Sequence, residues 1–204
     1  MEMDRDFWND SFKEGPEGVH VLDFVIGDEI AHLEPGRALD LGCGAGSNAL
    51  MLAGQGWRVT GVDWSEEAVR VASEAAAAQG LEARFIVGDV TTWEPPETYD
   101  LVISTYALPA GADARTAVRT ARSALADGGT LLVVEWDVSM REVWEFFEEG
   151  DFLPLAEMTE ILSDLTIEKA EVRRISEMFS DPDDMRYDFG REANIAIFRA
   201  RRMD

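Results

Sequence analysis

The sequence predicts an α/β fold: a mostly parallel sheet of seven strands, helices on both faces, and an antiparallel hairpin at the C-terminal end. Short apolar runs alternate with amphipathic or alanine-rich stretches through most of the chain, the order that builds a parallel sheet with crossover helices. The last two apolar runs are separated by the polar, proline-containing segment 180–184, which cannot be a crossover helix. We therefore expect these two strands to pair antiparallel.

The expected elements follow hydrophobic periodicity and the positions of glycine and proline. Strands are expected at 37–41, 57–63, 83–87, 99–104, 130–136, 166–175 and 194–201. Helices are expected at 18–33, 48–55, 65–80 and 113–126, with one or two more between 139 and 164. Ser65 is interpreted as the cap of the third helix, and Gly128–Gly129 as the terminator of the fourth.

Composition narrows the class of protein. The 204 residues are enough to bury a core in one domain. Acidic residues outnumber basic ones 41 to 18, a net charge of -23 that disfavours nucleic acid and anionic membranes as partners. The single cysteine fits a reducing compartment. The acidic N-terminal residues lack the basic and apolar regions expected of a signal peptide, and no apolar run approaches the ~18 residues needed to cross a bilayer. We expect a cytoplasmic protein without a bound metal, since no cysteine–histidine spacing would build a metal site.

One turn carries most of the functional information. An apolar strand containing Asp40 runs into Gly42, Gly44 and Gly46 and then into a helix, the arrangement of a nucleotide-binding turn. A pyrophosphate over this turn would be repelled by the Asp40 carboxylate, whereas an ammonium group would be attracted. Ser47 also stands where the dinucleotide fingerprint has glycine or alanine. The turn therefore favours S-adenosylmethionine (SAM) over NAD.

Two further acids follow the next expected strands, so that three carboxylates meet at the carboxyl edge of the sheet. Asp63 is suited to accept hydrogen bonds from both ribose hydroxyls. Asp89 can accept from the adenine amino group while the N–H of Val90 serves a ring nitrogen. Trp64 is either an adenine wall or a core residue.

These segments resemble the motifs of class I SAM-dependent methyltransferases, in the expected order. They are Leu39-Asp40-Leu41-Gly42-Cys43-Gly44-Ala45-Gly46, Gly61-Val62-Asp63-Trp64-Ser65, Val87-Gly88-Asp89-Val90, Tyr99-Asp100-Leu101-Val102-Ile103-Ser104 and Leu125-Ala126-Asp127-Gly128-Gly129-Thr130. The resemblance implies a Rossmann-like fold with SAM as cofactor, and it adds Cys43 and Ser104 to the expected cofactor contacts. Cys43 is interpreted as a packing residue rather than a catalytic thiol. More loosely, the whole chain is similar to small tellurite-resistance and thiol methyltransferase-like proteins.

Methyl transfer from a sulfonium is an in-line displacement, so holding the reactants in line supplies much of the rate, and a base is needed only for some acceptors. The catalytic residue is not identified. Candidates are Tyr106, Glu135 and His20. The sequence after the fourth strand, Ser104-Thr105-Tyr106-Ala107, lacks the Asp/Asn-Pro-Pro-aromatic element of nucleic-acid amino-methyltransferases. A small-molecule acceptor is therefore expected.

The expected layout is one methyltransferase domain over 1–204, with N-terminal lid helices (1–34), a SAM-binding core (36–136), and C-terminal helices and hairpin (137–204). The aromatic residues Phe7, Trp8 and Phe12 either fold over the cofactor or simply pack a helix. A SAM-binding sensor without transferase activity is the alternative function. The sequence leaves open whether the protein is a monomer or a homodimer.

Overall fold

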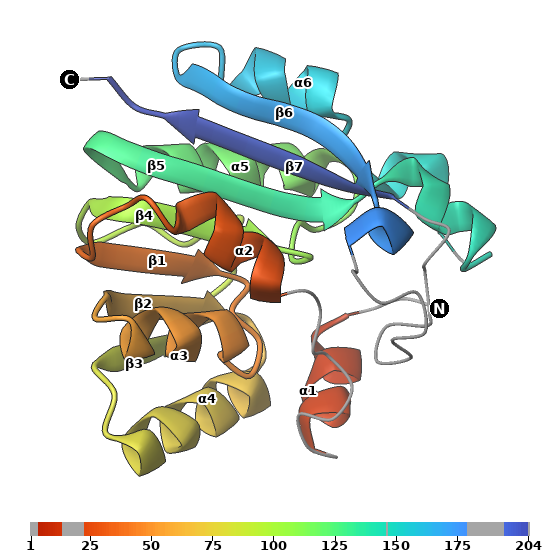
Figure 1. The fold of residues 1–204 in the computed structure, drawn as a ribbon. Coiled ribbons are helices and arrows are strands. Elements are labelled where there is room, and N and C mark those ends of the chain that lie inside the picture. The colour runs from red at the N-terminus through yellow and green to blue at the C-terminus, as the bar shows by residue number, and fades with distance from the viewer. Residues whose placement is uncertain (1–3, 14–22, 146, 179–193, 204) are drawn as a thin grey trace.

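The computed structural model describes residues 4–13, 23–145, 147–178 and 194–203. Its seven strands form one sheet in the order β3-β2-β1-β4-β5-β7-β6 (Figure 1). The strands are β1 (Arg37–Leu41), β2 (Arg58–Asp63), β3 (Ala83–Val87), β4 (Tyr99–Thr105), β5 (Leu125–Trp136), β6 (Thr166–Arg174) and β7 (Asn194–Arg201). β1 to β5 are parallel, and β7 lies antiparallel between β5 and β6. The predicted fold class is confirmed.

Helices cover both faces of the sheet, which lies between two hydrophobic cores. They are α1 (Arg5–Lys13), α2 (Asp23–Ile30), α3 (Ser47–Gly54), α4 (Glu66–Gln79), α5 (Ala112–Ser123) and α6 (Leu155–Ile161), with 3-10 turns at Val138–Glu142, Glu149–Asp151 and Ile175–Met178. α2 and α3 pack on one face and α5 and α6 on the other. Within β1, Ala38 enters the first core while Leu39 and Leu41 enter the second, because successive side chains of a strand point to opposite faces.

The predicted ends of α4 are correct. The Ser65 side chain accepts a hydrogen bond from the Ala68 N–H (3.1 Å), and Glu66 and Glu67 lie in the first turn, where acids favour the helix dipole. Gly80 closes the helix in the left-handed conformation, with φ 63°.

The Gly128–Gly129 pair does not terminate a helix, contrary to the prediction. α5 ends at Ser123, and β5 already begins at Leu125. The glycines instead accommodate an irregularity in the β4–β5 pairing, where the register shifts between Tyr99 and Leu101. Gly128 has a φ of 73°, and a Cβ on Gly129 would lie 2.9 Å from the Tyr99 carbonyl oxygen.

The prediction of amphipathic helices across 139–164 is wrong for most of that range. Among the described residues of that range, α6 alone is an α-helix, and two short 3-10 turns precede it. The aromatic residues of the segment pack on one another: ring centroids lie 5.9 Å apart for Trp144 and Phe147, and 5.3 Å apart for Phe147 and Phe152. This tertiary packing, with Gly150 in its middle, outweighs the helical periodicity. Of the helix expected at 18–33, residues 18–22 lie outside the described residues, and α2 ends at Ile30.

Between β3 and β4 the chain contains no helix. Residues 88–98 form turns and irregular structure throughout. A crossover between parallel strands usually carries a helix that covers one face of the sheet. Here residues 88–98 form a loop in place of that helix.

The cap of α4 yields a stability prediction. We expect Ser65→Ala to lower the free energy of unfolding by about 1 kcal/mol or more, because the Ala68 N–H then loses its cap in a buried setting. Urea denaturation measures this. Ser73→Ala, at an exposed position on the same helix, is the matched control and should change stability by less than about 0.5 kcal/mol. Equal losses in the two variants would contradict the role given to Ser65.

Candidate functional site

The glycine-rich turn follows β1 at the carboxyl edge of the sheet. The N–H groups of Gly42 (2.8 Å) and Cys43 (3.1 Å) both donate to the Val62 carbonyl of β2. Gly42, Gly44 and Gly46 have φ values of 73°, 50° and 86°, in the left-handed region that residues with a Cβ avoid. The turn thus depends on glycine at all three positions.

Two of these glycines are required by packing as well. A Cβ on Gly42 would lie 2.2 Å from the Cβ of Ala107, in the segment that follows β4. A Cβ on Gly46 would lie 2.9 Å from the Cβ of Ala72 in α4. These close contacts hold the turn between α4 on one side and the segment that follows β4 on the other.

Gly44 lies instead against α1. A Cβ there would be 3.3 Å from the Cζ atom of Phe12, which is 7% exposed. The same helix is held by Asn9, whose Oδ1 accepts hydrogen bonds from the Ser65 hydroxyl (2.7 Å) and the Glu67 N–H (3.4 Å). Figure 1 shows α1 beside α4, at the carboxyl ends of β1 and β2. The N-terminal aromatic segment therefore docks on the turn.

Asp63 ends β2 and is joined to the turn. Its Oδ2 accepts a hydrogen bond from the Gly44 N–H (2.8 Å), and its Oδ1 accepts one from the Ser65 N–H (2.9 Å). Burial raises the pKa of this carboxyl group, and the N–H groups of Ser65, Gly44 and Trp64 oppose the shift. A carboxylate has about four acceptor positions, so acceptor capacity remains for a ligand hydroxyl.

Asp40 lies beneath the turn and is 1% exposed, in register with Gly61 of β2 and Ile103 of β4. Beside it, burial raises the pKa of the Cys43 thiol well above its usual range, and the negative charges of Asp40 and Asp63 add to that shift. A thiol in this setting stays protonated and is a poor nucleophile. Its environment is that of a packing residue.

The expected adenine contacts lie at the ends of β2 and β3. Asp89, Val90 and Trp64 are all half-buried. The Oδ1 atom of Asp89 accepts hydrogen bonds from the backbone N–H (2.8 Å) and the hydroxyl (2.7 Å) of Thr91, which orients its carboxylate.

The ends of β4 and β5 bring an aromatic group to the same edge of the sheet. Ser104 is buried, and two residues later Tyr106 has a φ of 52°, the one non-glycine positive φ among the described residues. The Tyr106 N–H donates to the Val134 carbonyl (2.9 Å). Its ring centroid lies 4.3 Å from that of Trp136, which lies 6.2 Å from that of Trp144.

Glu135 holds this region in place. Its Oε1 accepts hydrogen bonds from the N–H groups of Ala107 (2.7 Å) and Leu108 (2.9 Å). Burial raises the pKa of Glu135 to about 7, against the effect of these N–H groups. Because Ala107 lies against Gly42, the carboxylate links the end of β5 to the glycine-rich turn through the strained segment at Tyr106.

Sequence reasoning missed Asn48. This residue lies in the first turn of α3, and its Nδ2 donates to the Thr105 hydroxyl (2.8 Å). Its Oδ1 is buried and has no hydrogen-bond partner among the described residues. Its position directly after the glycine-rich turn was the available signal. The candidate His20 lies outside the described residues.

In the part of the chain that the structure describes, no group of three or more His, Cys, Asp or Glu side chains is arranged to hold a metal ion. None of the helices in this part of the chain is long and apolar enough to cross a membrane.

The chain has a Rossmann-like sheet, a glycine-rich turn after β1 and acids at the strand ends. These are features of cofactor-binding α/β proteins. The family described as a methyltransferase domain matches residues 38–129. The ribosomal RNA small subunit methyltransferase C of Alcanivorax borkumensis is 46% identical over 57 residues, which are 28% of this chain and 18% of that protein. The chain spans less than half the length of the curated relatives it matches.

Two solved structures have the same fold over nearly the whole chain. TehB from Haemophilus influenzae has a TM-score of 0.71 at 21% identity, covering 96% of this chain and 67% of that one. The magnesium protoporphyrin IX methyltransferase from Synechocystis PCC 6803, solved with bound SAH, has a TM-score of 0.71 at 20% identity and covers 97% of both chains. Residues 38–129 thus resemble a methyltransferase domain, and the chain has the fold of these two structures.

Glu135 yields a prediction about pH. Its pKa of about 7 lies above the usual 4.5, so the folded state binds a proton that the unfolded state releases between these values. The free energy of unfolding should therefore fall as pH rises through this window, by on the order of 1–3 kcal/mol. Urea titrations from pH 4.5 to 7.5 should show this slope in the wild type.

Glu135→Gln keeps the oxygen acceptor and removes the titration, so its profile should lack that slope. Glu142→Gln, at an exposed position, should follow the wild-type profile. Parallel profiles for the wild type and Glu135→Gln would contradict the burial effect.

Proposed function

We propose that the protein transfers the methyl group of SAM to a small organic acceptor. The observation that carries this proposal is the hydrogen bond between the Gly44 N–H and Asp63, which joins the glycine-rich turn of β1 to the acid of β2 at the carboxyl edge of the sheet. A ligand crevice at this edge is the general rule for open α/β sheets. The match to the methyltransferase domain supports the same reading.

The residues of the site fit SAM. Gly44 lies against the Phe12 side chain of α1 rather than against the sheet, so α1 is the element that covers the turn at this point. Asp63 retains acceptor capacity for ribose hydroxyls, and Asp89 with the N–H of Val90 suits an adenine edge. Asp40 contributes a negative charge that attracts the ammonium of the methionine end. When bound, SAM supplies a methyl group activated by its sulfonium.

The chain's own contribution to the reaction is orientation. Tyr106, Trp136 and Trp144 form a series of aromatic rings beside the glycine-rich turn, a surface for the apolar or aromatic body of an acceptor. One Glu135 oxygen already holds the Ala107–Leu108 segment, so we assign it to positioning rather than to proton abstraction. Holding the acceptor in line with the methyl group supplies the rate advantage.

A small molecule suits the charge of the chain better than RNA does, although one relative acts on ribosomal RNA. A net charge of -23 repels a phosphate backbone and lowers the affinity for it. The same composition, with one cysteine, supports a cytoplasmic location.

α1 acts in this proposal as a lid. Phe12 covers Gly44, and Asn9 is anchored at the start of α4, so the helix shields the turn from water. Closure over a bound cofactor slows its dissociation.

Calorimetric titration tests the cofactor assignment. SAM and its demethylated product should bind, while NAD should not. Asp63→Asn should weaken SAM binding at least about tenfold, because charge-assisted hydrogen bonds are lost. Asp113→Asn, at an exposed position of α5, is the matched control. Saturable NAD binding without a response to SAM would contradict the proposal.

Turnover separates an enzyme from a sensor. With a panel of thiols, amines and hydroxylated aromatics, the proposal expects demethylated product to form with at least one acceptor. Tight SAM binding without turnover across the panel would favour a sensor instead.

The dissociation rate of SAM tests the proposed role of α1 as a lid. We expect Phe12→Ala to raise the dissociation rate of SAM by roughly tenfold, since an aromatic contact over the turn is removed. Ser11→Ala, exposed on the same helix, should leave the rate unchanged. Stopped-flow fluorescence with a competing ligand measures both rates. Identical rates in the two variants would show that α1 is only a packing element.

A further inference from the structure

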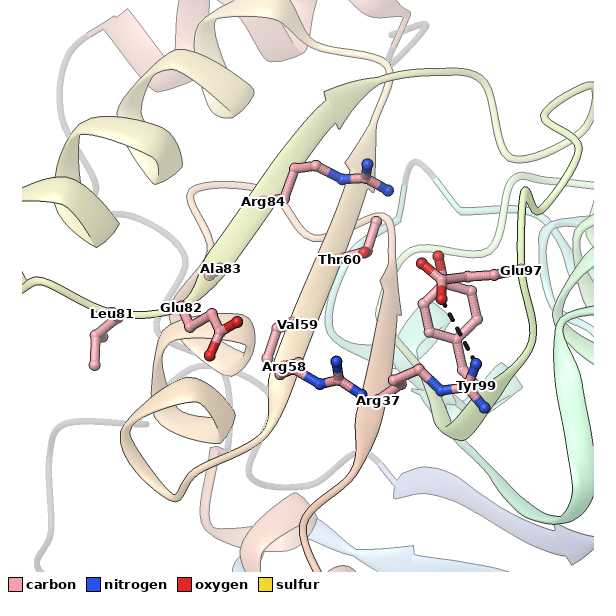
Figure 2. A pocket seen from close by; sticks show the side chains of 10 residues that line it. All are labelled: Arg37, Arg58, Val59, Thr60, Leu81, Glu82, Ala83, Arg84, Glu97 and Tyr99. Carbon is pink, nitrogen blue, oxygen red and sulfur yellow. Dashed lines mark ion pairs between the residues drawn. The ribbon is translucent and has the colours of Figure 1, made fainter.

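A hollow lies at the amino ends of β1 to β4, at the opposite edge of the sheet from the glycine-rich turn. It has a volume of about 330 Å³ (Figure 2). Its polar lining includes Arg37, Arg58, Arg84, Thr60, Tyr99 and Glu97. We propose that this hollow binds the phosphate group of a small soluble molecule, at a site separate from the glycine-rich turn.

The hollow exists because the β3–β4 connection lacks a helix. Thr60 of β2 is in register with Arg84 of β3, and Arg58 lies two residues before Thr60. Alternate residues of a strand share a face, so all three side chains point to the same side of the sheet as Val62, the side of α5 and α6. Residues 88–98 provide no helix to cover them.

The arginines of the hollow differ in their partners. Arg37 pairs with Glu97 and with Asp100, each at 3.6 Å. Within the described ranges, by contrast, no carboxylate lies within 4.0 Å of the guanidinium groups of Arg58 and Arg84. Figure 2 shows both groups extending from neighbouring strands toward the side of Glu97 and Tyr99. The chain as a whole has a net charge of -23, but here two guanidinium groups from neighbouring strands have no carboxylate partner among the described residues. Their positive charge favours the binding of an anion.

Tyr99 supplies an independent observation. Its side chain is 1% exposed, and its buried hydroxyl has no hydrogen-bond partner among the described residues. A buried hydroxyl without a partner is unfavourable, and nearly all such groups in folded proteins are satisfied. Tyr99 lines the hollow, so in the proposed complex a phosphate oxygen serves as the acceptor of this hydroxyl. Thr60, 6% exposed, adds a second hydroxyl to the lining.

The donor set indicates phosphate rather than carboxylate. Two guanidinium groups, each able to donate two parallel hydrogen bonds, together with two hydroxyls need more acceptor positions than the two oxygens of a carboxylate provide. A phosphate monoester presents three terminal oxygens. Glu82 and Glu97, also in the lining, can accept hydrogen bonds from hydroxyls of a small ligand that carries the phosphate.

Inorganic phosphate is the probe for the test. Thermal unfolding and calorimetry at constant ionic strength, with sodium chloride as the balancing salt, should show saturable stabilisation by phosphate. Arg58→Gln and Arg84→Gln should each weaken phosphate binding at least about tenfold, because both residues contribute charge-assisted hydrogen bonds. Both are exposed, so the variants should fold. Tyr99→Phe should weaken binding severalfold without lowering the unfolding temperature of the free protein.

Arg119→Gln, at an exposed position of α5, is the matched control and should bind phosphate as the wild type does. SAM binding should be equal in all these variants, so the result is independent of the proposed transferase function. The inference is overturned if phosphate stabilises no more than chloride, if acetate binds as tightly as phosphate, or if Arg58→Gln and Arg84→Gln leave the phosphate affinity unchanged.

Discussion

The 2.8 Å hydrogen bond from the Gly44 N–H to the Asp63 carboxylate is the interaction on which the site depends. It forms only because β1 and β2 run parallel and end together, and because Gly44 can adopt a φ of 50°. The bond brings a backbone turn and a strand-end acid to one point at the carboxyl edge of the sheet. α1, α4 and the chain after β4 then pack around that point.

The other end of the site is held by a carboxylate that faces inward. Glu135 fixes the Ala107–Leu108 segment, and Ala107 in turn lies against Gly42. The strained φ of Tyr106 is maintained within this arrangement, and it aligns the Tyr106 ring with Trp136. The glycine-rich turn and the Tyr106–Trp136 ring pair are thus linked by a continuous series of contacts, which suits a reaction that depends on alignment.

Periodicity and the strand-end acids predicted the parallel core, the antiparallel hairpin and the turn, because each depends on local sequence. Segment 139–164 was mispredicted because aromatic packing against the end of β5, such as Trp144 on Trp136, decides its conformation. Glu135 was a candidate catalytic residue from the sequence, but its hydrogen bonds to Ala107 and Leu108 depend on a tertiary approach that spacing does not reveal. The buried Asn48 Oδ1, which has no hydrogen-bond partner among the described residues, and the hollow beside Arg58 also depend on tertiary contacts that sequence spacing does not reveal.

A crystal structure with S-adenosylhomocysteine tests the central claim most directly. The account predicts the ribose hydroxyls on Asp63, the amino-acid end over the 42–46 turn, and the sulfur on the side of Tyr106 and Trp136. A nucleoside bound elsewhere, or a ribose without contact to Asp63, would contradict it.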